Sequence, residues 1–267
     1  MTLRLPRLGL LMTLALVASI VLDASEPKSP GDQTDQSADR LLARGRLWAG
    51  GTGLENVKSL TIKGTQGPRG QTQRLYDVFI LRPDDCQIRR EGGWVHTLER
   101  SAFWMVIPQD FQGSFTPEMQ ATAERSTRQN CADIVATFLL RPWQNTSAAS
   151  VGPIAVEGLR GEGVRIFLPS RPGNTFVFDP GDGRPLGYVS GNPTSVGEGK
   201  DVVIALFQDY STVNGVRLPT HIEFHYLPEQ HVVDWKVAEL RVNDLKASDF
   251  HQGGGNDRLL EAPNPRP

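Results

Sequence analysis

The stretch that decides the fold is VVIALFQDYSTVNGVRLPTHIEFHY, residues 202–226. Two runs rich in apolar and β-branched residues, 202–211 and 216–226, flank the pair Asn214-Gly215. Asn and Gly accept the positive φ angles of a tight two-residue turn, so this pair is among the strongest short-range hairpin signals. The stretch therefore predicts two long antiparallel strands joined by a tight turn.

Further strand-like runs lie on both sides of this hairpin, and clusters of Gly, Pro and Asp separate them. We expect strands at residues 57–63, 76–82, 87–91, 94–98, 103–107, 155–159, 164–168, 174–179, 185–189 and 232–242. Since no two of these runs are linked by a clear crossover helix, we expect the sheet to be antiparallel.

Two helices are expected besides the strands. A short helix begins at Ser37, a suitable N-cap residue, and ends at Gly50-Gly51, because glycine adopts the left-handed conformation of a C-cap. A longer helix begins at Thr116, another N-cap residue, and stops before Pro142, which cannot continue a helix.

An antiparallel sheet of this many strands curls rather than staying flat. We therefore predict an α+β, mainly β fold: a strongly curved antiparallel sheet, or half-open β-barrel, whose concave side the helices cover. The strand at residues 76–82 has Tyr76, Val78 and Ile80 on one face and an apolar pair on the other. Such a strand is either buried on both sides or adds an apolar surface for a ligand.

Composition excludes several classes of protein. Among 267 residues, 22% are charged and the net charge is −2, so the chain is neither a coiled coil nor wholly disordered. No positive field gathers nucleic acid, and we expect no such partner. The sequence has neither a phosphate-binding loop nor the Gly-x-Ser-x-Gly elbow of serine hydrolases. We therefore expect no enzyme and no cofactor.

The amino-terminal segment indicates export. Arg4 and Arg7 precede an apolar run, residues 8–22, which is shorter than the roughly 20 residues of a membrane-spanning helix. This pattern is typical of a secretory signal peptide, here residues 1–24; the alternative is an uncleaved anchor. We expect a periplasmic protein with a polar linker at 25–36, a folded domain at 37–250 and a disordered tail at 251–267.

Export changes the meaning of the two cysteines, Cys86 and Cys131. In an oxidising compartment two lone cysteines often pair, and a disulfide between them is one interpretation. The other is that both are small buried hydrophobic residues.

Three segments, in this order, resemble the periplasmic lipoprotein carriers of the LolA/LolB type and related outer-membrane lipoprotein-sorting proteins. They are VFILRPD at residues 78–84, FWMVIP at 103–108 and FQDYSTVNGVRLPT at 207–220. The resemblance extends over most of residues 38–250. It implies a half-open β-barrel with a helical lid around an apolar cavity.

The resemblance also implies a function without chemistry. Such a carrier holds lipid or the acyl chains of a lipoprotein while it crosses an aqueous compartment. An alternative on the same fold is an envelope sensor or protein-interaction module, whose partner would be another envelope protein.

By the same resemblance, Arg82 matches the family's strand-end arginine, which helps to hold the lid; the alternative is a solvated charge. We predict that Arg82 binds ligand together with Tyr76, Val78 and Ile80 on the same strand face, and with Trp104 of the second segment.

One cluster of metal-ligating residue types stands apart from this interpretation. His221, Glu223 and His225 alternate along a strand and therefore share a face, as the zinc ligands of a small metal-dependent enzyme could. The simpler interpretation is the outer, polar face of a strand whose Ile222 and Phe224 face the core. It explains the alternation with nothing added, so we predict no metal site.

Overall fold

The computed structural model describes residues 35–81, 85–99, 102–108, 111, 114–141, 147–168, 171–190, 202–227, 229–246 and 258–261. The chain divides into two compact units, Met1–Gln33 and Thr34–Pro267, and all described residues belong to the second. The predicted signal peptide and nearly all of the predicted linker lie outside the described residues. None of the described helices combines the length and apolar character that a membrane span needs.

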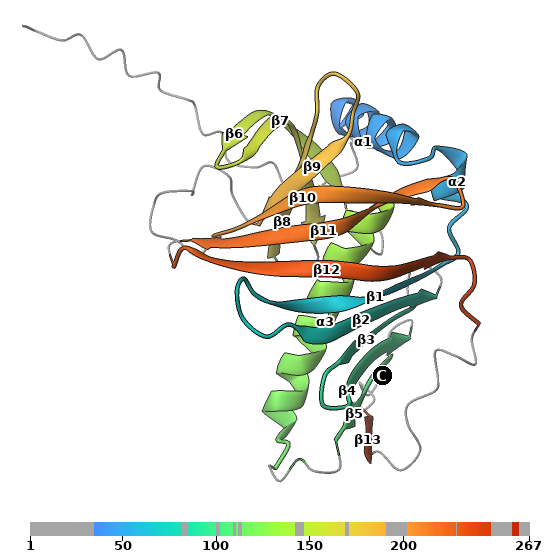
Figure 1. The fold of residues 1–267 in the computed structure, drawn as a ribbon, viewed down its shortest axis with the longest axis vertical. Coiled ribbons are helices and arrows are strands. Elements are labelled where there is room, and N and C mark those ends of the chain that lie inside the picture. Colours follow the sequence, from blue (N-terminus) through green and yellow to red (C-terminus); the bar gives the residue numbers. More distant parts are fainter. Residues whose placement is uncertain are drawn as a thin grey trace, which may run out of the picture. The chain divides into compact units, whose positions relative to one another are not determined.

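The described strands form one antiparallel sheet (Figure 1). They are β1 (Ser59–Pro68), β2 (Arg74–Leu81), β3 (Asp85–Arg90), β4 (Trp94–Glu99), β5 (Ala102–Ile107), β6 (Ala148–Val156), β7 (Leu159–Leu168), β8 (Arg171–Phe178), β9 (Pro185–Ser190), β10 (Val202–Val213), β11 (Val216–Leu227), β12 (His231–Val242) and β13 (Arg258–Glu261).

The order of the strands is β13-β5-β4-β3-β2-β1-β12-β11-β10-β9-β8-β7-β6. Two meanders, β1–β5 and β6–β12, are thus joined side by side where β1 pairs with β12, with Leu60 opposite Val242. The long helix α3 (Pro117–Leu139) connects the meanders and crosses one face of the sheet (Figure 1). The predicted fold class, a curved antiparallel sheet with few helices, is confirmed.

The deciding hairpin is confirmed as well, since Asn214 and Gly215 join β10 to β11 with φ angles of 50° and 78°. The prediction of a strand at residues 155–159 is wrong. There β6 ends at Val156 and β7 begins at Leu159, and Gly158, with φ of 75°, provides the turn between them. Strand β13 lies inside the predicted disordered tail, where it pairs with β5.

Both predicted helices are present, and a short one, α2 (Thr52–Glu55), follows the first. Helix α1 (Gln36–Trp48) is capped by Asp35 rather than Ser37, because the Asp35 carboxylate accepts hydrogen bonds from the Ser37 and Ser150 amides. Helix α3 begins as predicted, with the Thr116 hydroxyl accepting from the Met119 amide.

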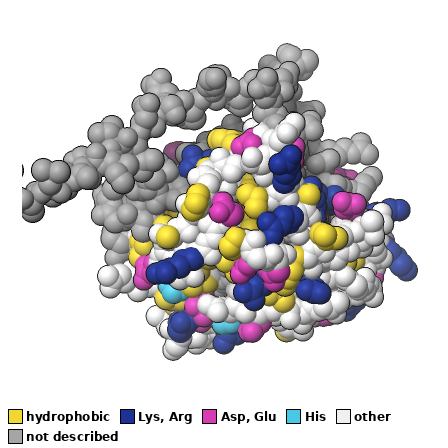
Figure 2. All heavy atoms as spheres, turned by 90° about the horizontal axis from the view of Figure 1, so that it is seen from above, with side chains coloured by type: hydrophobic (Ala, Val, Ile, Leu, Met, Phe, Trp, Pro, Cys, Tyr) yellow, Lys and Arg dark blue, Asp and Glu magenta, His cyan; other side chains and the backbone are white. Residues whose placement is uncertain are grey.

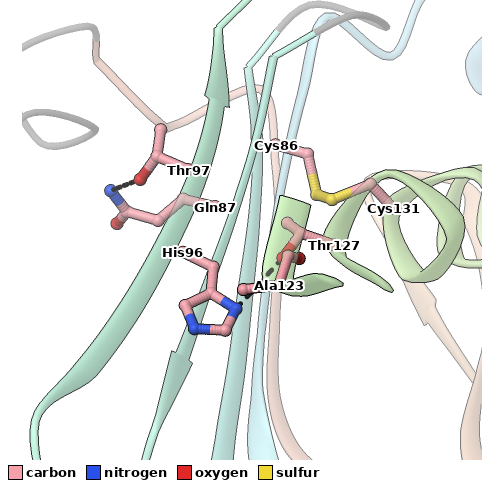
Figure 3. Close-up of a disulfide and its surroundings, with 7 residues drawn as sticks. All are labelled: Cys86, Gln87, His96, Thr97, Ala123, Thr127 and Cys131. Carbon is pink, nitrogen blue, oxygen red and sulfur yellow. Dashed lines mark hydrogen bonds between the residues drawn. A yellow bond between two sulfur atoms is a disulfide. The ribbon is translucent and has the colours of Figure 1, made fainter. Parts of the chain in front are cut away.

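Helices α1 and α3 contribute to the same hydrophobic cluster, with Leu42 from α1, Phe138 from α3, and Leu60 and Ile80 from the sheet. A disulfide between Cys86 on β3 and Cys131 on α3 ties the helix to the sheet, with 6.1 Å between the two Cα atoms (Figure 3). Of the two interpretations of the cysteines, the structure has the disulfide.

Candidate functional site

Two hollows lie along α3. The first, which we call the large groove, has a volume of about 1030 Å³ and lies between the amino-terminal half of α3 and β2–β5. The second, which we call the small pocket, has a volume of about 230 Å³ and lies between the carboxyl-terminal half of α3 and β8–β12. Gln66 and Tyr76 line both hollows, so the two are neighbours.

One face of α3 lines both hollows. The helix residues of the large groove are Glu118, Met119, Thr122, Ala123 and Ser126; those of the small pocket are Gln129, Asn130, Asp133, Ile134 and Thr137. Each member of the second set follows its counterpart by 11 positions (129 − 118 = 11). Eleven residues make about three turns of an α-helix, so the two sets are stacked on the same side.

The walls of the large groove are mainly apolar. Besides the helix residues they include Leu75, Trp94, Met105 and Phe115. Leu75 and Met119 are 46% and 44% exposed, whereas on the face shown in Figure 2 hydrophobic side chains lie scattered among charged ones. The groove therefore presents apolar surface that the described residues leave exposed.

Charged side chains stand at the border of the large groove. Arg74, Arg90, Glu91 and Glu118 all line it. The guanidinium of Arg90 lies 5.7 Å from the ring centre of Tyr76, a cation–π contact. The border can therefore interact with polar groups of either charge.

His96 lies in the wall of the large groove and is electrically neutral at neutral pH. Burial, together with the positive charge of Arg90, lowers its pKa to about 4. Its Nδ1 is 3.0 Å from the Thr127 hydroxyl, which itself donates to the Ala123 carbonyl (Figure 3). This contact and the neighbouring disulfide hold the middle of α3 against β3 and β4.

The small pocket is more polar. Asn174 of β8 donates a hydrogen bond of 2.8 Å from Nδ2 to the Asp133 carboxylate of α3. Asn174 and Trp235, 2% and 3% exposed, each also have a buried polar atom without a hydrogen-bond partner among the described residues. These atoms are Asn174 Oδ1, an acceptor, and Trp235 Nε1, a donor.

The structure distributes the predicted ligand-binding residues over different environments. Tyr76 lines both hollows, but Val78 and Ile80, on the same face, are fully buried in the core and line neither. Trp104 lies half-buried on the other face of β5 from Met105, a groove residue. Arg82 lies outside the described residues, and its role stays a prediction.

Sequence reasoning did not assign four apolar residues of the large groove, Trp94, Met105, Phe115 and Met119. The sequence does show that Met105 alternates with Trp104 and that the other three lie next to predicted element ends. Which of them line a hollow depends on where α3 crosses the sheet, and no local pattern fixes that.

The His-Glu-His cluster lies on the face of β11 opposite to α3. Potential ligand atoms of His221, Glu223 and Asp234 lie within 4.8 Å of one another. Arg69 occupies the same place: its Nη2 is 2.7 Å from Glu223 Oε1 and 2.8 Å from Asp234 Oδ1. Hydrogen bonding from Arg69 lowers the pKa of Asp234 to about 2. The carboxylates thus already have a cation, as the simpler interpretation of a polar outer face requires.

Comparison with known proteins gives matches among solved structures alone, since no protein-family model and no curated sequence matches this chain. A DUF1329 family protein from Desulfovibrio piger matches with a TM-score of 0.51 and 10% identity, over 82% of this chain and 98% of that one.

Two further matches have lower TM-scores. A LolA superfamily protein from Nitrosomonas europaea matches with a TM-score of 0.47 and 11% identity, over 82% of this chain and 97% of that one. A putative outer membrane lipoprotein-sorting protein domain from Vibrio parahaemolyticus matches with 0.46 and 9%, over 81% and 95%. At such identities a match shows the fold alone. This chain therefore shares its fold with the DUF1329 family protein from Desulfovibrio piger.

Proposed function

We propose that the protein is an exported, non-catalytic carrier that binds lipid or lipoprotein acyl chains in the large groove. The observation that carries this proposal is the exposed apolar surface of the groove, above all Leu75 and Met119. Uncovered apolar surface in a concave site is typical of a ligand site. Each methylene group of an acyl chain that it hides from water contributes about 0.8 kcal/mol.

The exposure of α3 supports the entry and release of such a ligand. The groove-lining residues Glu118, Met119 and Thr122 are exposed, whereas the helix is largely buried from Cys131 onward. The amino-terminal half of the helix is thus the less firmly packed half. A segment with few buried contacts opens at low free-energy cost, as a lid over a transported ligand must.

Export is part of the proposal. A signal peptide at residues 1–24 would deliver the chain to the periplasm. The disulfide between Cys86 and Cys131 agrees with an oxidising compartment.

The alternative is an envelope sensor or protein-interaction module on the same fold. In that case the large groove would receive apolar side chains of another envelope protein instead of an acyl chain. Mass spectrometry of molecules extracted from protein purified out of its native envelope separates the two. Co-purified lipid supports the carrier, and a co-purified polypeptide without lipid supports the alternative.

The direct test places a charge on the groove wall. Met119→Glu should weaken binding of a fluorescent acyl ligand at least about tenfold, because a carboxylate must then be desolvated against the chain. Leu47→Glu is the matched control: Leu47 is 73% exposed on α1 and does not line the groove. Circular dichroism checks that both variants are folded. If they then bind the acyl ligand equally well, the proposal that acyl chains bind in the large groove is contradicted.

A further inference from the structure

A chain of two hydrogen bonds in the wall of the large groove fixes which nitrogen of His96 carries the proton. The Thr127 hydroxyl has a single hydrogen, which it donates to the Ala123 carbonyl at 2.7 Å. The contact of 3.0 Å between this hydroxyl and His96 Nδ1 therefore takes its hydrogen from the ring (Figure 3). His96 is neutral, and a neutral imidazole has one N–H, so Nδ1 carries the proton and Nε2 is left with a lone pair.

The lone pair of His96 Nε2 is open to a ligand. Nε2 has no hydrogen-bond partner in the described part of the chain. It is also not among the buried side-chain atoms that lack a partner, so water reaches it. His96 lines the large groove together with Trp94 of the same strand and Met105, its cross-strand partner on β5. An acceptor without a partner thus lies between apolar side chains of the groove wall.

The state of His96 favours an uncharged donor. A lone pair accepts from an N–H or O–H group but offers nothing to the oxygen of a carboxylate or phosphate. The positive charge of Arg90, which together with burial holds the pKa of His96 low, repels a cationic donor as well. An amide N–H or a hydroxyl fits, whereas an ester or a bare hydrocarbon chain has no hydrogen to donate.

We propose that His96 Nε2 accepts a hydrogen bond from an uncharged donor, an amide N–H or a hydroxyl, beside the acyl chain that the large groove binds. This inference rests on the proposed function and narrows the class of ligand. Thr127 does not line the groove and is a positioning residue. It holds the proton on Nδ1, since the hydrogen bond of one ring nitrogen sets the state of the other.

The test uses three probes that share one acyl chain. N-propylpalmitamide has an amide N–H, 3-hydroxypropyl palmitate has a hydroxyl, and propyl palmitate has no donor. Each displaces a fluorescent acyl ligand from the full-length protein, and the affinity of each donor probe is divided by that of propyl palmitate. Comparing these ratios between variants cancels the different hydration of the probes.

His96→Phe keeps an aromatic ring and removes the acceptor. It should lower at least one of the two ratios about three- to tenfold, the effect of one hydrogen bond between neutral groups. The ratio that falls identifies the donor as an amide or a hydroxyl. His231→Phe is the matched control and should leave both ratios unchanged, because His231 is 44% exposed and does not line the groove.

Nitrogen-15 NMR of the histidine rings tests the position of the proton directly. The unmodified protein should show a protonated Nδ1 and an unprotonated Nε2 in His96, with the signals assigned by their loss in His96→Phe. Thr127→Val removes the partner of Nδ1, so part of the proton should move to Nε2 and the affected ratio should fall in part. An unchanged spectrum and unchanged ratios in Thr127→Val would overturn the positioning role of Thr127.

A proton on His96 Nε2 in the unmodified protein would overturn the inference. Unchanged ratios in folded His96→Phe would overturn it too, while the carrier proposal stands. If His96→Phe does not fold, the spectrum of the unmodified protein and the ratios of Thr127→Val decide. Failure of all three probes to displace the fluorescent ligand would overturn acyl binding, and the inference with it.

Discussion

The two faces of β11 show how differently one strand can use alternate residues. Ile222, Phe224 and Tyr226 face α3 and line the small pocket, whereas His221 and Glu223 lie on the outer face in the cluster around Arg69. The outer face gathers more charge, yet its carboxylates have their cation in place. The inner face of β11 carries no charged residue in the small pocket, and its neighbours there, Asn174 of β8 and Trp235 of β12, each have a buried polar atom without a partner among the described residues.

A dense group of titratable side chains is a weak sign of a ligand site when its members form ion pairs with one another. Unsatisfied bonding capacity in a hollow is the stronger sign, because a native fold leaves it only at a cost. Three predictions follow for the two faces, in order of decreasing effect.

The largest effect is expected from the disulfide, which fastens α3 to the inner face. Cys86→Ala combined with Cys131→Ala should lower the free energy of unfolding by about 4 kcal/mol, the chain-entropy value for this loop, whose ends are 45 residues apart. Acyl binding should weaken as well, because both hollows depend on the position of α3. Denaturant unfolding measures the first effect and ligand titration the second.

The oxidised protein supplies the control for that experiment. Thiol titration of protein isolated from its native compartment should find no free thiol. Two titratable thiols there would contradict the disulfide, and an unchanged unfolding curve after reduction would contradict its contribution to stability.

The next effect concerns His96 on the inner face. Its pKa is lowered from 6.5 to about 4 in the folded protein, so the unfolded chain binds a proton that the folded one does not. The contribution of His96 to the free energy of unfolding therefore has its full value above pH 6.5. It decreases as the pH drops from 6.5 toward 4, by at most about 3 kcal/mol in total. His96→Gln should flatten this part of the stability curve, as urea unfolding at a series of pH values can measure. An identical slope in the variant would show that other groups cause the loss.

The smallest effect belongs to the outer face. Arg69→Ala leaves Asp234 and Glu223 without their shared cation and should cost about 1–2 kcal/mol, since Arg69 itself is half-exposed. Wild-type stability should also fall as acid protonates Asp234, from the ordinary pKa of 3.8 down to about 2, and less so in the variant.

Acyl binding by Arg69→Ala should equal that of the unmodified protein, since the outer face does not line the groove. Arg241→Ala, which breaks an exposed pair with Glu239, is the control and should change stability little. Weaker acyl binding by Arg69→Ala, with the fold intact, would mean that the two faces are coupled.

Local sequence signals were sufficient to predict most helices and strands of the fold. The Asn214-Gly215 pair fixes its hairpin because both residues tolerate positive φ. Thr116 marks the start of α3 because its side chain supplies the cap. The strand expected at residues 155–159 failed because Glu157 and Gly158 form a turn between β6 and β7, and Gly158 has a positive φ.

The candidate site was less predictable. Alternation correctly placed Tyr76, Val78 and Ile80 on one face, yet Val78 and Ile80 are buried in the core, whereas Tyr76 lines both hollows. Because successive strand residues point to opposite faces, Trp104 lies on the face of β5 opposite to the groove residue Met105. Strand patterns give the face of each residue but not what covers that face.

Local patterns in the sequence were sufficient to predict the antiparallel, mainly β architecture and the long helix, because turns, caps and alternation act within a few residues. The contact between Cys86 and Cys131, which makes the disulfide, and the position of Arg69 between Glu223 and Asp234 come from the tertiary structure. It also decided which helix face lines the two hollows. These outcomes depend on contacts between distant segments, whose distances no local pattern in the chain specifies.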